Sequence, residues 1–230
     1  FDDPARRVNL LDSEALASLK GVLDSLRERS DRSFPRALVL LSGKDEQFIA
    51  GADVAEFDRL ASPAEAEAKA REAQLLFEEF SLLPYPTVAG INGPCLGGGV
   101  ELALAMRYRV ASNARGVAIG LPEVQLGILP GFGGTQRLPR LIGLVPSLDL
   151  LLTGRSLEPR RALRAGLVDA VLPREGFTDR VIQWTEALLQ GEHEPKRRPP
   201  AFPLFIMQSI PPLRRYVLGQ AKQNVLRQTR

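Results

Sequence analysis

Two glutamates lie beside glycine-rich turns in the middle of this 230-residue chain, and their placement suggests proton transfer. Glu101 follows the glycines of residues 97–99, Glu123 ends the segment 120–123, and a third glycine-rich segment covers residues 130–135. Glycines lack the Cβ atom that keeps a ligand away from the main chain, so peptide N–H groups at such turns approach a developing negative charge closely. The pattern predicts an oxyanion hole with a proton donor and a proton acceptor beside an activated carbonyl.

Each of these signals also has a simpler explanation. Glu101 alone fits a first-turn glutamate that favours the helix dipole and points to water, and Glu123 alone fits a surface residue. The glycines of residues 130–135 alone fit turn punctuation before a helix. Against this, Glu101 lies among small and apolar neighbours in residues 97–105, where an unpaired carboxylate is costly to bury. The ordered set indicates a site more strongly than any member of it.

The composition narrows the class of protein. Hydrophobic content of 44% and charged content of 25% are ordinary for a globular protein. No apolar run approaches the roughly 18 residues of a membrane span, and the first residues do not resemble a signal peptide, so we expect a cytoplasmic enzyme. Cys95 is the only cysteine, which excludes an intrachain disulfide, and it is expected to pack as a small apolar residue.

Metal and nucleic-acid functions are disfavoured by the sequence. His193 is the only histidine, so neither a zinc site nor a Ser/His/Asp triad is expected. The net charge is +3 and the pI about 9.3, but the basic residues gather at 196–198 and 214–215 without interleaved aromatic residues. Nucleic acid is therefore an unlikely partner.

Strands are expected to alternate with helices, which is typical of an α/β fold. The first helix should begin after an N-cap at Asp12 or Ser13 and run to Glu28, and Asp53 is expected to cap another helix. Apolar runs predict buried strands, and one such run covers residues 37–41. The further strands are expected at 86–91, 108–112, 117–119 and 167–171, and the further helices at 63–83, 98–105, 135–142, 145–152 and 159–164. Residues 1–175 are expected to hold the core and the site, and residues 176–230 a helical C-terminal region with a proline-rich break at 198–200.

Four blocks of this sequence resemble a known family. Residues 48–53, 92–103, 120–127 and 130–138 are similar in order and spacing to the enoyl-CoA hydratase/isomerase (crotonase) superfamily, and the likeness runs from Asp3 to about Pro173. Within that superfamily, residues 8–12, Leu121 and Phe132 are most similar to the hydratase domains of multifunctional fatty-acid oxidation enzymes. The resemblance implies a spiral of ββα units with a helical C-terminal region.

The resemblance also implies an acyl-CoA thioester as substrate and gives roles to backbone groups. The oxyanion hole would consist of the N–H groups of Ala52 and Gly98. Ala50, Gly51 and Asp53 would line the substrate site, where Ala50 contacts the adenine of CoA through its main chain. No resident cofactor is implied, because acyl-CoA is the substrate.

Two carboxylates and one further backbone group would carry the proton transfers. Glu101 would take a proton from the water that adds to Cβ of a trans-2-enoyl thioester, and Glu123 would deliver one to Cα. The N–H of Gly131 would help to hold the water. The same proton exchange at the α and γ carbons would move a double bond from position 3 to position 2.

The sequence departs from the family pattern at three positions. Glu46 and Ala55 stand where some hydratases carry lysines that contact the CoA phosphates, so those contacts are expected elsewhere. Leu121 stands where many single-domain hydratases have a polar residue before the Pro-Glu pair. The chemistry should be retained, while the relative rates and the support of Glu101 should differ.

Three other functions compete with this interpretation. Crotonase-fold hydrolases, decarboxylases and dehalogenases usually change one or both carboxylate positions, whereas both are present here as Glu101 and Glu123. A non-catalytic or RNA-binding member would be revealed by salt-dependent retention on RNA. A two-carboxylate glycosidase is disfavoured by one Trp and three Tyr, which offer little surface for sugar stacking.

The chain is also expected to be part of a longer polypeptide. The family would have completed a strand before Phe1, and residues 217–230 are expected to form a helical end without a terminating Gly or Pro. The next part of that polypeptide is expected to be a nicotinamide-dependent 3-hydroxyacyl-CoA dehydrogenase. The expected protein partners are a thiolase subunit and further copies of the chain.

Overall fold

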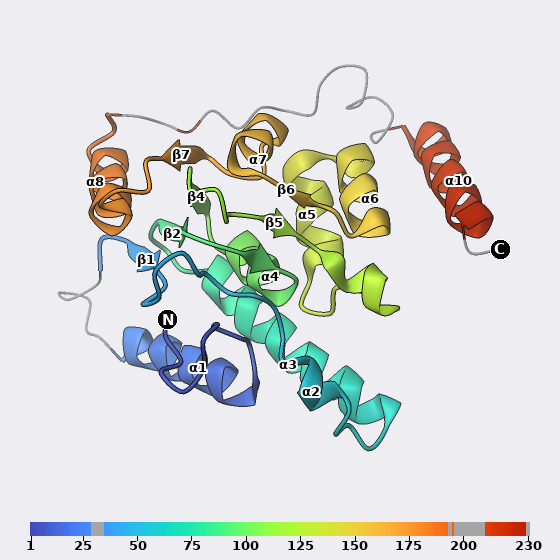
Figure 1. Cartoon of the computed structure of the whole chain (residues 1–230), viewed down its shortest axis with the longest axis horizontal. Helices are drawn as coiled ribbons and strands as arrows, with labels where there is room; N and C mark the ends of the chain where they lie inside the picture. The colour runs from blue at the N-terminus through green and yellow to red at the C-terminus, as the bar shows by residue number, and fades with distance from the viewer. Residues whose placement is uncertain (29–34, 193–194, 196–209, 229–230) are drawn as a thin grey trace.

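A four-stranded parallel sheet forms the centre of the molecule (Figure 1). The computed structural model describes residues 1–28, 35–192, 195 and 210–228. The strand order is β1-β2-β4-β7, and every pair is parallel. A second, three-stranded sheet has the order β3-β5-β6, in which β3 and β5 are parallel and β6 is antiparallel to β5. The bounds are β1 Leu38–Leu40, β2 Thr87–Ile91, β3 Cys95–Leu96, β4 Tyr108–Ser112, β5 Ile119–Gly120, β6 Ser156–Leu157 and β7 Ala170–Leu172.

Helices surround these sheets. On one side α1 packs against α3, and α3 packs against α4; α5 packs against both α4 and α6. Asp12 caps α1, Asp53 caps α2, and Pro159 is the first residue of α7, as expected. The bounds are α1 Ser13–Arg27, α2 Val54–Phe57, α3 Pro63–Ser81, α4 Gly98–Ala105, the 3-10 helix η2 Pro122–Leu126, α5 Gly134–Ile142, α6 Leu144–Thr153, α7 Pro159–Ala165, α8 Phe177–Leu189 and α10 Pro211–Gln228.

The helix α4 is the most deeply buried helix of the site. All eight of its residues are buried, because glycine, alanine and leucine occupy almost every position and leave no polar face for water. Gly99 permits the close approach of the main chain at Ile49, since a Cβ at Gly99 would lie 2.3 Å from the Ile49 carbonyl oxygen. A carboxylate on this helix is therefore forced into the interior.

The outer strand β1 is half-buried, although the sequence predicted a buried strand at 37–41. β1 pairs only with β2 and forms the edge of its sheet, so one side lacks a neighbouring strand. The apolar run at 37–41 therefore indicated a strand correctly but carried no information about the place of that strand in the sheet.

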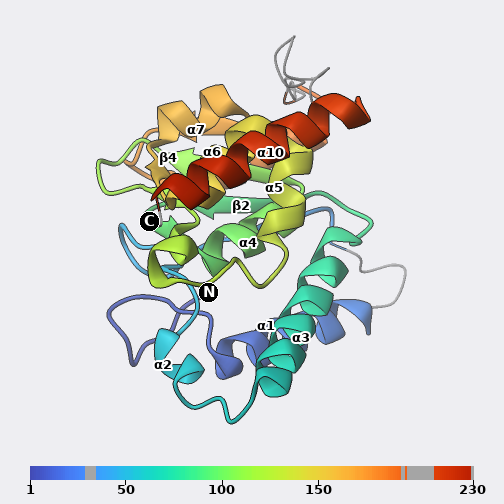
Figure 2. The same ribbon diagram turned by 90° about the vertical axis from the view of Figure 1, so that its right-hand side faces the viewer.

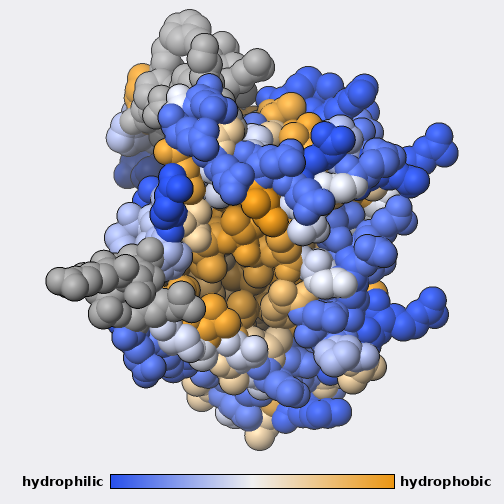
Figure 3. All heavy atoms as spheres, turned by 90° about the vertical axis from the view of Figure 1, so that its left-hand side faces the viewer, coloured by the Kyte–Doolittle hydropathy of each residue, from blue (hydrophilic) through white to orange (hydrophobic). Residues whose placement is uncertain are grey.

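Figure 3 shows the face on the left of Figure 1, where hydrophobic residues line a hollow that hydrophilic residues surround.

Several elements differ from the sequence prediction. The expected strand at 167–171 is β7 at Ala170–Leu172, because Leu167 still ends the α7 turn through a hydrogen bond to the Ala162 carbonyl. The expected strand at 117–119 is β5 at Ile119–Gly120. The short elements β3, β6 and η2 were not predicted, since two to five residues give too little periodicity.

The C-terminal helices lie in two places. α8 packs against β2 and β7, and α10 contacts α6, in front of which it crosses in Figure 2. The expected break at 198–200 lies outside the described residues, and the expected boundary near residue 176 stays a prediction. No helix in the described part of the chain is long and apolar enough to cross a membrane.

Candidate active site

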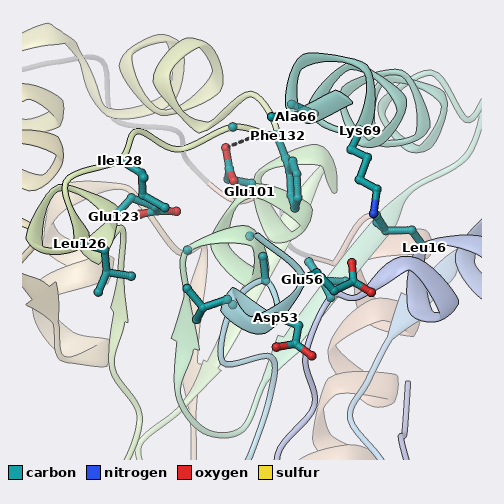
Figure 4. Close-up of a pocket in the computed structure, with 18 of the residues that line it drawn as sticks. Leu16, Asp53, Glu56, Ala66, Lys69, Glu101, Glu123, Leu126, Ile128 and Phe132 are labelled. Atoms are coloured by element: carbon teal, nitrogen blue, oxygen red, sulfur yellow. Dashed lines mark hydrogen bonds between the residues drawn. The ribbon is translucent and has the colours of Figure 1, made fainter. Parts of the chain in front are cut away.

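A cavity of about 460 Å³ lies between α1, α2, α3, α4 and η2. All eight residues proposed from the sequence line it, and Figure 4 shows the labelled side chains. Glu101 and Glu123 enter the cavity from α4 and η2. The eight are Ala50, Gly51, Ala52, Asp53, Gly98, Glu101, Glu123 and Gly131.

Glu101 is almost fully buried, with 1% of its surface exposed. Its Oε1 accepts hydrogen bonds from the N–H groups of Phe132 at 2.8 Å and Gly134 at 2.7 Å. Gly134 is the first residue of α5, so the carboxylate also lies at the positive end of that helix. A Cβ at Gly134 would lie 3.0 Å from Glu101 Oε1, which explains a glycine there. The simpler interpretation of Glu101 as a water-facing glutamate is wrong.

Glu123 is 9% exposed and lies in the first turn of η2. Its Oε2 is buried and has no hydrogen-bond partner among the described residues. A Cβ at Gly97 would lie 2.9 Å from Glu123 Oε1, and Gly97 has a positive φ of 50°. Gly97 thus makes room for this carboxylate in a conformation that favours glycine.

The two carboxyl groups have raised pKa values. Burial raises the pKa of Glu101 to about 7, and the nearby charge of Glu123 adds to this. The N–H groups of Gly134 and Phe132 and the charge of Arg137 act in the opposite direction. Burial also raises the pKa of Glu123. Both groups are thus shifted toward the pH range in which carboxyl groups exchange protons during catalysis.

Two backbone turns meet beside these carboxyl groups. Ile49 and Cys95 form a parallel bridge, and Ala52 and Gly98 each follow three residues later on the paired segments. Gly98 is the first residue of α4, so its N–H is one of those a helix leaves without an intrahelical acceptor. The N–H of Leu11 donates to the Gly51 carbonyl, and the Leu11 carbonyl accepts from the N–H of Asp53. Because these bonds use the residues on either side of Ala52, the N–H of Ala52 points away from Leu11. Ala52 and Gly98 both line the cavity, and their role as the oxyanion hole stays a prediction.

The other predicted residues shape the walls. Asp53 caps α2 and pairs with Arg6 at 2.8 Å; that hydrogen bond, aided by the Ala55 N–H, lowers the pKa of Asp53. Ala50 donates its N–H to the Asn9 carbonyl, and the carbonyl of Gly131 accepts from Gln74 Nε2 at 2.7 Å. These bonds fix three segments of the cavity wall.

The sequence analysis did not identify most of the apolar residues that line the cavity, nor the one lysine among the described lining residues. Lys69 is the only basic residue among the described residues that line the cavity, and it lies far from Glu123 in Figure 4. Leu126 and Leu129 also line the cavity, although 61% and 74% of their surfaces are exposed. Lys69 lies on the Ala- and Glu-rich α3, where nothing in the local pattern separates a pocket residue from a solvent-facing one.

None of the three positions that depart from the family pattern supplies a cation to this cavity. Glu46 pairs with Arg174 outside this cavity, and Ala55 has no charge. Leu121 is buried beside the Pro-Glu pair. No group of three or more His, Cys, Asp or Glu residues in the described ranges is arranged to hold a metal ion. Cys95 is fully buried, and burial raises its thiol pKa, as expected for a packed residue.

Replacing Glu101 with glutamine is expected to stabilise the protein at alkaline pH. The folded-state pKa of about 7 lies above the ordinary 4.5, so between these values the folded state binds more protons than the unfolded state. Stability therefore falls as pH rises through this window, by at most about 3 kcal/mol. We expect Glu101→Gln to unfold about 5 °C above the parent at pH 8 and close to it at pH 5.

Thermal unfolding at both pH values tests this, with Glu186→Gln as control because Glu186 is an exposed glutamate of α8. The control should not gain stability between pH 5 and pH 8. An equal melting temperature of Glu101→Gln and parent at pH 8 would contradict a costly buried carboxylate.

The geometry brings two buried carboxyl groups and two glycine-containing backbone turns to one cavity. A family model described as "Enoyl-CoA hydratase/isomerase" matches residues 1–196. The chain therefore belongs to the enoyl-CoA hydratase/isomerase family, as the motifs predicted.

Solved structures support the same fold. An enoyl-CoA hydratase from Bacillus anthracis has 34% identity and a TM-score of 0.73, over 81% of this chain and 70% of that one. An enoyl-CoA hydratase/isomerase from Cupriavidus metallidurans has 29% identity and a TM-score of 0.70, over 79% of this chain and 66% of that one. The predicted α/β crotonase fold is thereby confirmed.

Longer proteins are also similar to this chain. A fatty acid oxidation complex subunit alpha from Aliivibrio fischeri is 51% identical over 173 residues, which are 75% of this chain and 25% of that protein. A protein of the same name from Vibrio cholerae is 40% identical over 232 residues, covering 100% of this chain and 32% of that protein. The chain thus spans a quarter to a third of the length of these relatives.

Proposed function

We propose that this chain is an enoyl-CoA hydratase that adds water to trans-2-enoyl-CoA to give 3-hydroxyacyl-CoA. The observation that carries this proposal is the pair of buried carboxyl groups, Glu101 and Glu123, facing one cavity beside the glycine turns. Hydration needs one group to accept a proton from water and another to supply a proton to carbon. The carboxyl group of Glu101 accepts two backbone hydrogen bonds, whereas Oε2 of Glu123 accepts none from the described residues, so the two groups suit these different roles.

Glu101 acts as the base in this proposal. Its two backbone N–H donors favour the ionised form, which takes a proton from water as the oxygen bonds to Cβ. Glu123 acts as the acid, because a buried Oε2 without a partner favours the protonated form, which delivers its proton to Cα. Exchange with solvent then returns both groups to their starting states.

The backbone groups stabilise the charge that develops on the thioester oxygen. The N–H groups of Ala52 and Gly98 bind that oxygen, and the N–H of Gly131 holds the attacking water. Ala50, Gly51 and Asp53 bind the CoA part, with Ala50 contacting the adenine through its main chain. No resident cofactor takes part. The same carboxyl groups move a double bond from position 3 to position 2 by exchanging protons at the α and γ carbons.

The direct test is the loss of enoyl-thioester absorbance when crotonyl-CoA and longer enoyl-CoAs are added. Release of free CoA thiol, measured with a thiol reagent, would instead indicate a hydrolase. Salt-sensitive retention on RNA without turnover of any thioester would indicate a non-catalytic, RNA-binding member.

The longer relatives support a proposal about the whole protein. We place this chain as the hydratase part of a cytoplasmic multifunctional enzyme of fatty-acid β-oxidation that continues into a 3-hydroxyacyl-CoA dehydrogenase and associates with a thiolase subunit. The support is the chain's coverage of 25% to 32% of relatives named subunit alpha of a fatty acid oxidation complex.

A consequence is that these 230 residues hydrate enoyl-CoA but do not oxidise the product. With 3-hydroxybutyryl-CoA and NAD we expect no NADH absorbance from this chain. Addition of a separate 3-hydroxyacyl-CoA dehydrogenase should produce NADH at once, which controls for the substrate. NADH formed by the chain alone would contradict the division of activities.

A further inference from the structure

Arg137 folds back onto the turn that binds Glu101. It lies in the first half of α5, and its Nη1 donates to the Phe132 carbonyl at 2.9 Å. The guanidinium covers Gly133 so closely that a Cβ there would lie 2.2 Å from Nη1. Gly133 also has a φ of 108°, which favours glycine. The turn and the arginine therefore form one packed unit.

Three residues of α3 hold the outer side of this unit. Arg137 Nη2 pairs with Glu78 Oε2 at 3.0 Å, and Gln74 donates to the Gly131 carbonyl at 2.7 Å. The ring of Phe77 meets the ring of Phe132 edge to face, with centroids 5.8 Å apart. A 19-residue helix thus fixes the turn at several points.

We propose that Arg137 is a positioning residue that acts on Glu101 through the turn 131–134. Arg137 keeps the N–H groups of Phe132 and Gly134 directed at Glu101 Oε1 and adds a positive charge on that side. Arg137 does not line the cavity, so it acts without touching substrate. The activity part of this inference rests on the proposed hydratase function, whereas the effect on Glu101 does not.

The charges around Glu101 set the direction of the expected change. Glu123 of η2 raises the pKa of Glu101, and Arg137 of α5 lowers it; Glu78 of α3 lies behind Arg137 and is largely exposed. Removing the arginine charge should therefore raise the pKa of Glu101 from its value of about 7. A smaller fraction of Glu101 would be ionised at neutral pH and able to act as base.

The test compares Arg137→Gln with Arg140→Gln. Arg140 lies on the same helix but is exposed and outside the turn, so the control removes the same charge. In carbon-13 glutamate-labelled protein the Glu101 carboxyl signal is identified by its loss in Glu101→Gln. We expect Arg137→Gln to raise the Glu101 pKa by about half a unit or more and to shift the acidic limb of the kcat profile equally.

The kinetic constants should separate positioning from binding. At neutral pH we expect Arg137→Gln to lower kcat about tenfold with little change in KM, because the base is displaced and less ionised. Arg137→Lys keeps the charge but lacks the fork that bonds Phe132 and Glu78 together, so it should keep the pKa near the parental value while kcat falls. Arg140→Gln should change neither.

Glu78→Gln covers the case in which Arg137→Gln fails to fold. It leaves the arginine charge but weakens its anchor, so kcat should fall modestly without a rise in the Glu101 pKa. An unchanged Glu101 titration and kcat in Arg137→Gln would overturn the proposal. A lower melting temperature with an unchanged titration would also overturn it, since the role would be structural. A shifted titration in a chain without hydratase activity would uphold Arg137 and refute the proposed function.

Discussion

Replacing Glu101 or Glu123 with glutamine is expected to lower hydratase turnover by about 10²-fold or more, since each change removes one proton transfer. The shape of the cavity should persist. A glutamine Oε1 at position 101 still accepts from Phe132 and Gly134, and a glutamine at 123 fits the space that Gly97 leaves. Initial rates with crotonyl-CoA at saturating concentration give the comparison.

Glu186→Gln again serves as the control and should retain parental turnover. Circular dichroism and melting curves establish that the two site variants fold. Near-parental turnover in a folded Glu101→Gln or Glu123→Gln variant would assign the proton transfer to other groups.

Replacing Gly98 with valine is expected to reduce turnover by about 10²-fold, while affinity for free CoA changes less. A Cβ at Gly98 would lie 3.1 Å from Leu11 Cδ1 and 3.2 Å from the Phe132 ring. The branched side chain therefore forces a shift at the start of α4, where the N–H donor must meet the thioester oxygen. Since Phe132 also holds Glu101, the valine disturbs both the donor and the base.

Gly98→Ala separates these effects, because a single methyl group requires a shift of only a few tenths of an ångström. We expect an intermediate loss. Gly116→Val is the matched control, since a Cβ at Gly116 meets nothing within 4 Å. Full activity of Gly98→Val would show that Gly98 is not the oxyanion donor.

The sequence predicted the helix starts at Asp12 and Pro159 because a cap or a fixed φ acts within one turn. It also indicated the site, because two glutamates and the glycine-rich turns stand in a fixed order along the chain. The sequence did not show which glycine leaves room for which carboxyl group: Gly97 lies against Glu123 and Gly134 against Glu101.

The parts that the sequence did not predict depend on contacts between distant segments. Gln74 bonds to the turn 131–134 from 57 residues away, and Glu78 pairs with Arg137 from 59 residues away. Nothing in α3 distinguishes these two from other polar helix residues. The half-buried state of β1 likewise depends on which strand lies beside it. The short β3 and β6 exist through pairing with β5 and not through their own propensity.

The most direct test of the account is the fate of crotonyl-CoA incubated with the chain in D2O, analysed by mass spectrometry and NMR. Hydration by Glu101 and Glu123 predicts 3-hydroxybutyryl-CoA with a single deuterium at Cα and an intact thioester. Glu123→Gln should form this product at least about 10²-fold more slowly. Free CoA with crotonate, or unchanged crotonyl-CoA in the presence of folded protein, would contradict the hydratase assignment.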